Sequence, residues 1–251
     1  GLHLLELAIA DYPGDVLQPD ASAEQIRQVK ALFAQYDVRP DCGATGNDFT
    51  AGSATDVRES LDRVKRAADI AAALGVKVLR IFAGFTSDSL VYGERFDRAL
   101  EALQLAAEHV RGTGVRLAIE THGGVAATGD VLHHSATVTT RIDTMRKLLE
   151  SLPAAEIGMN YDPANLAAVG DAAPERWFGL FRDRIVLVHL KDFRDVPGGI
   201  VPAGCGEGRL DWKALPAVLK EYDGPALIEY ELPADVEDGL RRSLRFLKQN
   251  Q

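Results

Sequence analysis

The sequence predicts an α/β fold in which parallel strands form a (β/α)8 barrel, the TIM barrel. Short apolar segments alternate with amphipathic segments along the whole chain, which is typical of parallel strands connected by covering helices. Acidic or imidazole side chains also stand at the ends of four successive strand-like segments, and the carboxyl ends of barrel strands surround one pocket. An open sheet that binds a dinucleotide is not favoured, because no Gly-x-Gly-x-x-Gly motif follows the first strand-like segment.

Seven short apolar segments have the character of buried strands, whereas a complete barrel needs eight. We therefore expect the chain to begin at the second strand of the barrel, with the first strand and its helix absent from the sequence. The seven strand-like segments are residues 2–9, 38–42, 76–82, 115–120, 157–162, 185–190 and 226–229.

Seven segments that follow these strands have the spacing of amphipathic helices. In the segment 55–74, Val57, Leu61 and Val64 recur at three- and four-residue steps with charged residues between them. This helix is expected to stop at Gly75, since glycine commonly ends a helix. The helical segments are residues 21–36, 55–74, 94–111, 138–152, 174–181, 212–222 and 236–249.

Composition predicts one compact domain over residues 1–251, with 46% hydrophobic and 26% charged residues. The segment 193–209, rich in Gly and Pro, is expected to be the longest irregular loop, and no linker divides the chain. The formal net charge is −9 and no basic stripe is present, which argues against a nucleic-acid binder. Only Cys42 and Cys205 occur, and no apolar run reaches the length of a membrane span, so we expect a cytoplasmic protein with no membrane partner.

Four candidate metal ligands close four of the apolar segments: Glu120, Asp162, His189 and Glu229. Three carboxylates and a neutral imidazole give a mostly oxygen site that suits a divalent cation. Asp162 could instead only cap a helix that begins at Pro163, and His189 could be a core histidine. Glu120 and Glu229 are harder to explain structurally, because a buried glutamate without a partner is costly.

Four further residues are candidates for substrate binding. Side chains two apart on a strand share a face, which places His122 beside Glu120 and Lys191 beside His189. Lys191 either contacts substrate or pairs with a nearby acid. Asn165 follows Asp162 by three residues, and Glu207 lies in a Gly-Glu-Gly turn from which it could hold Lys191 or a ligand. His133 and His134 are expected on the surface or in a loop.

Five motifs occur in order along the chain, and together they resemble the xylose-isomerase-like barrel family of sugar isomerases and epimerases. They are "LAIETHGG" (117–124), "NYDPANL" (160–166), "VHLKDF" (188–193), "GEGRLDW" (206–212) and "ALIEYE" (226–231). The segment "GLHLLELAI" (1–9) resembles the second strand of the family. The family includes ketohexose 3-epimerases, inosose dehydratases and, more distantly, metal-dependent apurinic endonucleases.

The resemblance implies one divalent metal ion, often manganese, with magnesium, cobalt or zinc as alternatives. It would be held by Glu120, Asp162, His189 and Glu229, and Glu120 and Glu229 would also act as catalytic acid and base. The family often has histidine where this chain has Asn165. The endonuclease branch needs three metals and further histidines that the earlier strands lack, so with the acidic charge we expect no nuclease.

The expected function is that of a metal-dependent isomerase or epimerase acting on a ketose or a keto-polyol. The metal and two glutamates would support an enediolate-like intermediate. A lyase or dehydratase acting on a keto-sugar or inosose-like substrate is the alternative, because it shares the first proton removal. A non-catalytic sugar-binding barrel is the second alternative. The expected partner is a small sugar. The oligomeric state is left open, and a homo-oligomer is one possibility because members of the family often form dimers or tetramers.

Overall fold

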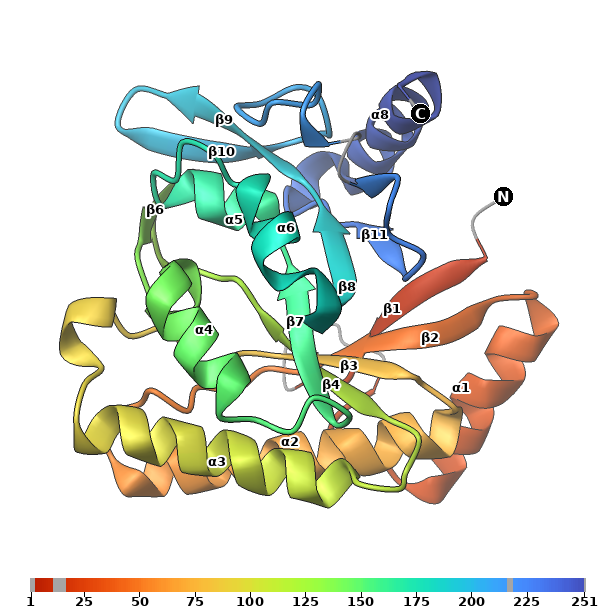
Figure 1. Ribbon diagram of the computed structural model, residues 1–251. Helices are drawn as coiled ribbons and strands as arrows, with labels where there is room; N and C mark the ends of the chain where they lie inside the picture. The colour runs from red at the N-terminus through yellow and green to blue at the C-terminus, as the bar shows by residue number, and fades with distance from the viewer. Residues whose placement is uncertain (1–2, 11–16, 216–218, 251) are drawn as a thin grey trace.

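The computed structural model describes residues 3–10, 17–215 and 219–250. Seven parallel strands form one sheet in the order β1-β2-β3-β4-β7-β8-β11, curved into a nearly closed barrel (Figure 1). The prediction of a parallel barrel with seven strands is confirmed. The strands are β1 (Leu4–Ala8), β2 (Arg39–Ala44), β3 (Val78–Ile81), β4 (Arg116–Glu120), β7 (Ile157–Tyr161), β8 (Ile185–Leu190) and β11 (Ala226–Ile228).

Strand register sets the carboxyl ends of neighbouring strands at the same level. Glu120, the last residue of β4, is paired with Asn160 near the end of β7. His189 of β8 is paired with Leu227, two residues before Glu229. Because parallel pairing keeps this register, side chains from separate parts of the chain meet at one end of the barrel.

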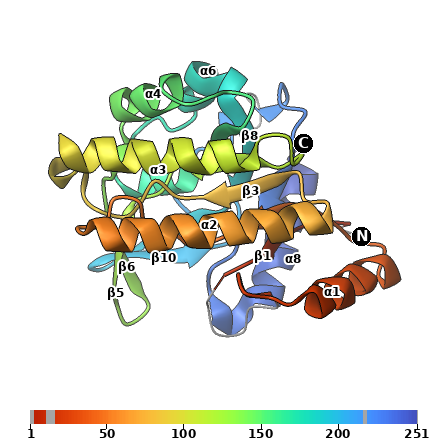
Figure 2. The ribbon, with the colours of Figure 1, turned by 90° about the horizontal axis from the view of Figure 1, so that it is seen from below.

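An outer layer of helices covers the barrel, and two long helices, α2 (Ala54–Leu74) and α3 (Glu94–Val110), lie side by side in it (Figure 2). The Ser53 side chain caps α2 by accepting from the Asp56 amide, and α2 ends at Gly75, as predicted, where φ is 84°. The other helices are α1 (Ala23–Gln35), α4 (Ile142–Glu150), α5 (Pro163–Ala168), α6 (Arg176–Phe181) and α8 (Val236–Gln249).

Alternate strand residues divide the core into two parts. Leu117 and Ile119 of β4 are fully buried in the apolar layer against the helices, whereas Ala118 and Glu120 face the barrel interior. Ala118 belongs to a separate apolar cluster inside the barrel. We call this cluster the barrel floor; its buried members are Cys42, Val78, Ala118, Val186, Leu187 and Leu227. The floor closes the interior beneath the carboxyl ends of the strands.

A second, four-stranded antiparallel sheet was not predicted. It has the order β5-β6-β10-β9 and is built from the segments that follow β4 and β8. The expectation of an irregular loop over 193–209 is therefore wrong, because a Pro197-Gly198 turn with φ of 89° at Gly198 folds part of it into a hairpin. The strands are β5 (Gly124–Thr128), β6 (Val131–Ser135), β9 (Asp192–Val196) and β10 (Gly199–Ala203).

The barrel has one seam, between β1 and β11, which are the two edges of the seven-stranded sheet in the described part of the chain. A largely apolar cavity of about 890 Å³ lies there. Its lining includes Leu4 of β1, Leu227 of β11 and Leu244 of α8. No eighth parallel strand occurs within residues 3–10, 17–215 and 219–250.

Several helix boundaries differ from those predicted. The segment 138–152 divides into a 3₁₀ turn, η2 (Val138–Thr140), and helix α4, and three further 3₁₀ turns occur. The helix expected over 212–222 includes residues 216–218, which lie outside the described residues, while residues 215 and 219 are helical. None of the helices that the structure describes is long and apolar enough to cross a bilayer. The other 3₁₀ turns are η1 (Asp88–Leu90), η3 (Arg182–Arg184) and η4 (Pro233–Asp235).

Candidate metal centre

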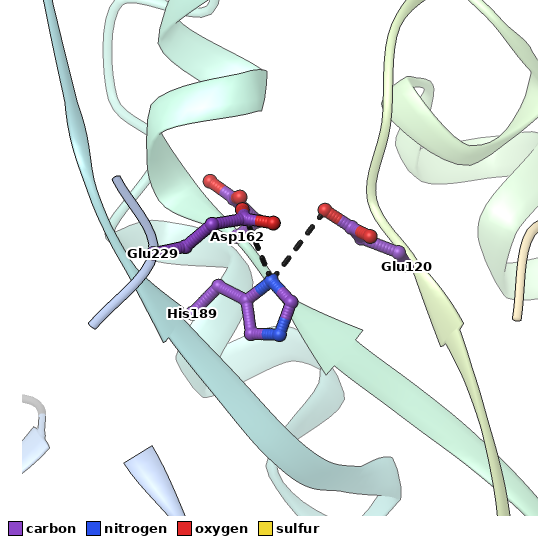
Figure 3. A group of neighbouring side chains, drawn as sticks. All are labelled: Glu120, Asp162, His189 and Glu229. Atoms are coloured by element: carbon purple, nitrogen blue, oxygen red, sulfur yellow. Dashed lines mark ion pairs between the residues drawn. The ribbon is translucent and has the colours of Figure 1, made fainter. Parts of the chain in front are cut away.

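The structure brings the four predicted ligands together inside the barrel (Figure 3). Each of Glu120, Asp162, His189 and Glu229 offers one ligand atom, and these atoms all lie within 4.8 Å of one another. The first three are fully buried, whereas the Glu229 side chain is 28% exposed. Glu229 therefore lies on the open side of the cluster.

The carboxylate of Asp162 caps a helix and also lies in the cluster. Its Oδ1 accepts from the Asn165 amide at 2.9 Å and so caps helix α5, which begins at Pro163. Its Oδ2 lies 3.2 Å from Lys191 Nζ, on the side of the cluster. Capping fixes the carboxylate without removing it from the cluster, because each role uses a different oxygen.

The His189 ring is oriented by a residue that the sequence reasoning did not select. Its Nε2 lies 2.7 Å from Oε2 of Glu6, on strand β1. Its Nδ1 points the other way, 3.3 Å from Glu229 Oε2 and 3.7 Å from Glu120 Oε1 (Figure 3). Within the described residues this buried Nδ1 has no hydrogen-bond partner. Nδ1 is thus directed at the point where the carboxylates converge.

Glu120 is held by contacts to both of its oxygens. Oε2 lies 3.2 Å from Arg80 Nε, and Oε1 accepts from Asn165 Nδ2 at 3.0 Å. Burial alone would raise the pKa of Glu120, but the neighbouring His189 ring and the Arg80 charge lower it to about 2. Glu120 is therefore ionised at neutral pH.

Lys191 neutralises the open side of the cluster. Its Nζ lies 2.7 Å from Glu229 Oε2 and 3.4 Å from Glu231 Oε1, in addition to Asp162. Although burial opposes ionisation of both partners, the Lys191 charge holds the pKa of Glu229 well below its usual value. Burial raises the pKa of Asp162 to about 7 despite Lys191, because Glu120 and Glu229 add negative charge.

The residues present fit a divalent cation. Three carboxylates and one imidazole nitrogen are ligands that such ions accept. In the described part of the chain, five carboxylates are packed around two permanent cations, Arg80 and Lys191, so the cluster has excess negative charge. The imidazole nitrogen is Nδ1 of His189, which is buried and has no hydrogen bond in the described part of the chain, so it is available to bind an ion.

Three of the four predicted substrate-binding residues lie at this cluster. Asn165 Nδ2 bridges Glu120 and Asp162 at 3.0 Å from each, and Lys191 pairs with acids as described. His122 packs edge-on against Phe82, and burial lowers the pKa of its imidazole. Contact of these three residues with substrate stays a prediction.

Glu207 is placed elsewhere. Its carboxylate accepts from the Gly204 amide at 3.1 Å and from Arg242 Nε at 2.7 Å, and the side chain is 40% exposed. Lys191 is instead paired with Asp162, Glu229 and Glu231. Among the described contacts Glu207 therefore does not hold Lys191, and its contact with a substrate stays a prediction.

Three residues of the site were missed. Glu6 and Arg80 are charged residues inside the apolar strands β1 and β3, and that isolation was the signal that could have found them. His134, expected on the surface or in a loop, instead lies on strand β6, with its ring centroid 5.1 Å from that of Phe193. Both of its ring nitrogens are buried and without a hydrogen-bond partner among the described residues.

A cavity of about 390 Å³ adjoins the cluster. Two of its lining residues lie next to the cluster. They are His122, two residues after Glu120, and Glu231, whose carboxylate contacts Lys191. The strands β5 and β6 and their turn supply much of its wall. Its lining residues are His122, Val125, Gly129, Asp130, Leu132, His134, Pro202, Glu231 and Leu232.

The family model described as "Xylose isomerase-like TIM barrel" matches residues 1–250. A search of curated protein sequences finds no match to this chain. Similar solved structures include D-allulose 3-epimerase from Methylomonas sp. in complex with D-allulose, which is 17% identical. The superposition covers 98% of this chain and 86% of the epimerase chain, with a TM-score of 0.75.

Two other structures have the same fold at similar identity. The probable 3-DHS dehydratase AsbF from Bacillus anthracis is 14% identical, with a TM-score of 0.71 over 90% of this chain and 82% of that one. A xylose isomerase-like TIM barrel protein from Mycobacterium smegmatis in complex with magnesium is 14% identical. Its TM-score is 0.73, over 100% of this chain and 84% of that one.

Proposed function

Since the chain belongs to the xylose isomerase-like TIM barrel family, we propose that it is a metal-dependent isomerase or epimerase of a ketose or keto-polyol. The observation that carries this proposal is that the carboxylates of two glutamates, Glu120 and Glu229, approach Nδ1 of His189 from different directions (Figure 3). A substrate carbon between Glu120 and Glu229 would have a carboxylate on each side. This is the arrangement that proton removal from one side and return on the other requires.

Glu120, Asp162, Glu229 and Nδ1 of His189 would hold one divalent ion, with manganese as our first choice from the mostly oxygen donor set. When bound, the ion would act as a Lewis acid that polarises the carbonyl and an adjacent hydroxyl of the sugar. A small sugar bound to a metal is in keeping with the D-allulose and magnesium complexes of proteins that share this fold.

The two glutamates have different surroundings, and these suggest how protons would move. Glu120 is fully buried and held by Arg80, which favours its ionised, proton-accepting form. Glu229 is partly exposed and lies 2.7 Å from Lys191 Nζ, whose charge holds the pKa of the Glu229 carboxyl well below its usual value. Glu229 would therefore start as a carboxylate too, and would take up from solvent, on its exposed side, the proton that it returns to the substrate.

The test is solvent deuterium uptake by ketoses, followed by mass spectrometry with the manganese-loaded protein. Glu229→Gln and Glu120→Gln should each reduce exchange by about a hundredfold or more, the usual range for losing a general acid or base. Glu59→Gln, at an exposed position on α2, is the control and should exchange as the wild type does. Manganese affinity is measured in the same variants, so that loss of the ion is separated from loss of proton transfer. Undiminished exchange in Glu229→Gln would rule out Glu229 as an essential acid or base.

A lyase or dehydratase is the second candidate, because it begins with the same proton removal and one dehydratase-named structure shares this fold. It would require a hydroxyl or glycosyl group to leave from the carbon next to the carbanion. The product mass distinguishes the two functions. An epimer or isomer keeps the mass of the substrate, and a dehydrated product is lighter by one water.

A further inference from the structure

The cavity beside the metal centre has a mainly apolar wall in which the polar groups include His122, His134 and Glu231. Among the described residues that line it, none is Lys or Arg. The residues outside the described part also contain no Lys or Arg in their sequence. The ionisable residues of the lining are Asp130, Glu231 and two histidines, so its fixed charges are negative.

Within the described part of the chain, the charges of Lys191 and Arg209 act on His134, and both cations already have acidic partners. Lys191 Nζ is paired with carboxylates of Asp162, Glu229 and Glu231 at 2.7 to 3.4 Å. Arg209 pairs with Asp195 at 2.5 Å and donates to the Ala167 carbonyl at 3.0 Å. A phosphate bound here would lie near the carboxylates of Asp130 and Glu231, and no lining cation would pair with it. Such an arrangement is electrostatically unfavourable.

His134 supplies the recognising group. Its ring is fixed between His122, whose ring centroid is 6.4 Å away, and Phe193 at 5.1 Å. Neither ring nitrogen has a hydrogen-bond partner among the described residues, although both are buried. Burial lowers the pKa of His134 to about 3, so the ring stays neutral and can both donate and accept. Such a ring matches a hydroxyl group, which also donates and accepts.

We propose that His134, together with Glu231, binds a hydroxyl group at the end of the substrate farthest from the metal, and that this end carries no phosphate. This inference rests on the proposed function, which places the carbonyl end of a ketose among Glu120, His189 and Glu229. A cavity of about 390 Å³ has room for the rest of a hexose chain. A four-carbon ketose is two carbons shorter than a hexose, and we expect it not to reach His134.

The experiment measures sugar binding to the manganese-loaded protein by calorimetry. The probes are four ketohexoses (D-allulose, D-tagatose, D-fructose and D-sorbose), their 6-phosphates and the ketotetrose L-erythrulose. The variants are His134→Phe, which keeps a ring against Phe193 but removes the nitrogens, and His133→Ala as the matched control. His133 is the exposed neighbour of His134 on β6.

The expected result has two parts. In the wild type, the 6-phosphate of the best ketohexose should bind at least about tenfold more weakly than the free sugar, because a doubly charged group would face two carboxylates. His134→Phe should weaken ketohexose binding about five- to tenfold, the loss of one or two neutral hydrogen bonds, and leave the ketotetrose within twofold. His133→Ala should change neither.

Equal or tighter binding of the 6-phosphate would overturn the inference and leave the proposed function standing. Unchanged ketohexose binding in folded His134→Phe would also overturn it. If His134→Phe does not fold, the phosphate comparison in the wild type still decides the charge of the cavity ligand. If no ketose binds although manganese does, the proposed function fails and this inference fails with it.

Discussion

Glu6 and His189 form a carboxylate–imidazole pair across the barrel, with Glu6 Oε2 2.7 Å from His189 Nε2. The two residues are 183 positions apart in the sequence and lie on strands β1 and β8. When Nε2 donates to Glu6, the proton is held on that nitrogen and Nδ1 is left with a lone pair. Such partners fix the tautomer and the orientation of a metal-binding histidine.

Replacement of Glu6 should therefore weaken metal binding although Glu6 is not among the predicted ligands. We expect Glu6→Ala to raise the dissociation constant for manganese about 10- to 100-fold, as is usual for outer partners of metal-binding histidines. Glu6→Gln should have a smaller effect, because a carboxamide oxygen can still accept from Nε2. Calorimetry with manganese checks both, with Glu59→Ala on the exposed face of α2 as control. Wild-type affinity in Glu6→Ala would show that His189 does not depend on this pair.

Metal binding should release protons. Burial disfavours the charged His189 ring, but the charges of Glu6 and Glu229 outweigh it and hold the pKa of His189 well above 6.5. The metal-free ring is therefore protonated at neutral pH and must lose a proton before Nδ1 can bind an ion. Asp162, with its pKa raised to about 7, is partly protonated as well.

We expect roughly one to two protons to be released per ion at pH 7, and the apparent affinity to fall as the pH is lowered. Calorimetry in buffers with different heats of ionisation measures this number. Above pH 8 the release should decrease, because Asp162 is already ionised there. An affinity that does not change between pH 6 and pH 8 would contradict protonation of these two groups in the metal-free protein.

The parallel barrel and the four central side chains could be predicted because their signals are local. An apolar segment that ends in Glu120 or His189 can be recognised by itself, and the barrel then brings such ends together. Glu6 and Arg80 were missed because they lie within strands rather than at their ends. Their partners are Glu120 and His189, whose proximity depends on the closure of the sheet.

The small antiparallel sheet was missed for a different reason. Its turn at Gly129-Asp130 joins Thr128 and Val131, a two-residue connection that is typical of hairpins. The strands on either side lack a buried apolar face, and β6 gains its second partner, β10, from a distant part of the chain. His134 was consequently expected on the surface, whereas this sheet places it in the cavity wall.

The two cysteine thiols should be unreactive in the folded protein. Burial, together with the charge of Glu6, raises the pKa of Cys42 to about 12, and burial raises that of Cys205 to about 12 as well. At pH 8 only about one thiol in ten thousand is then a thiolate, the reactive form. We expect Ellman's reagent to titrate no thiol in the native protein and both in 6 M guanidinium. Rapid reaction of one thiol without denaturant would show that the barrel floor around Cys42, or the loop around Cys205, opens readily.

Arg80 should stabilise the fold through its pairing with Glu120, which is fully buried. Arg80→Met keeps an unbranched side chain but removes the charge, and so leaves Glu120 among other carboxylates. Removing one member of a buried ion pair typically costs about 3–5 kcal/mol of unfolding free energy. Urea unfolding at pH 7 in EDTA measures this cost. Arg27→Met, which breaks an exposed pair with Glu24 on α1, is the control and should cost less than about 1 kcal/mol.

The loss in Arg80→Met should depend on pH and on metal in a defined direction. The pKa of Glu120 in the folded protein is about 2, below its usual value of 4.5, so its ionisation stabilises the fold above pH 4.5. That contribution is lost as the pH falls toward 2, and the difference between wild type and variant should shrink over the same interval. A bound divalent ion would replace the missing positive charge beside Glu120, so manganese should stabilise the variant more than the wild type at pH 7, provided that the variant still binds it. An equal loss with manganese and with EDTA would mean that Arg80 and the ion do not act on the same carboxylate.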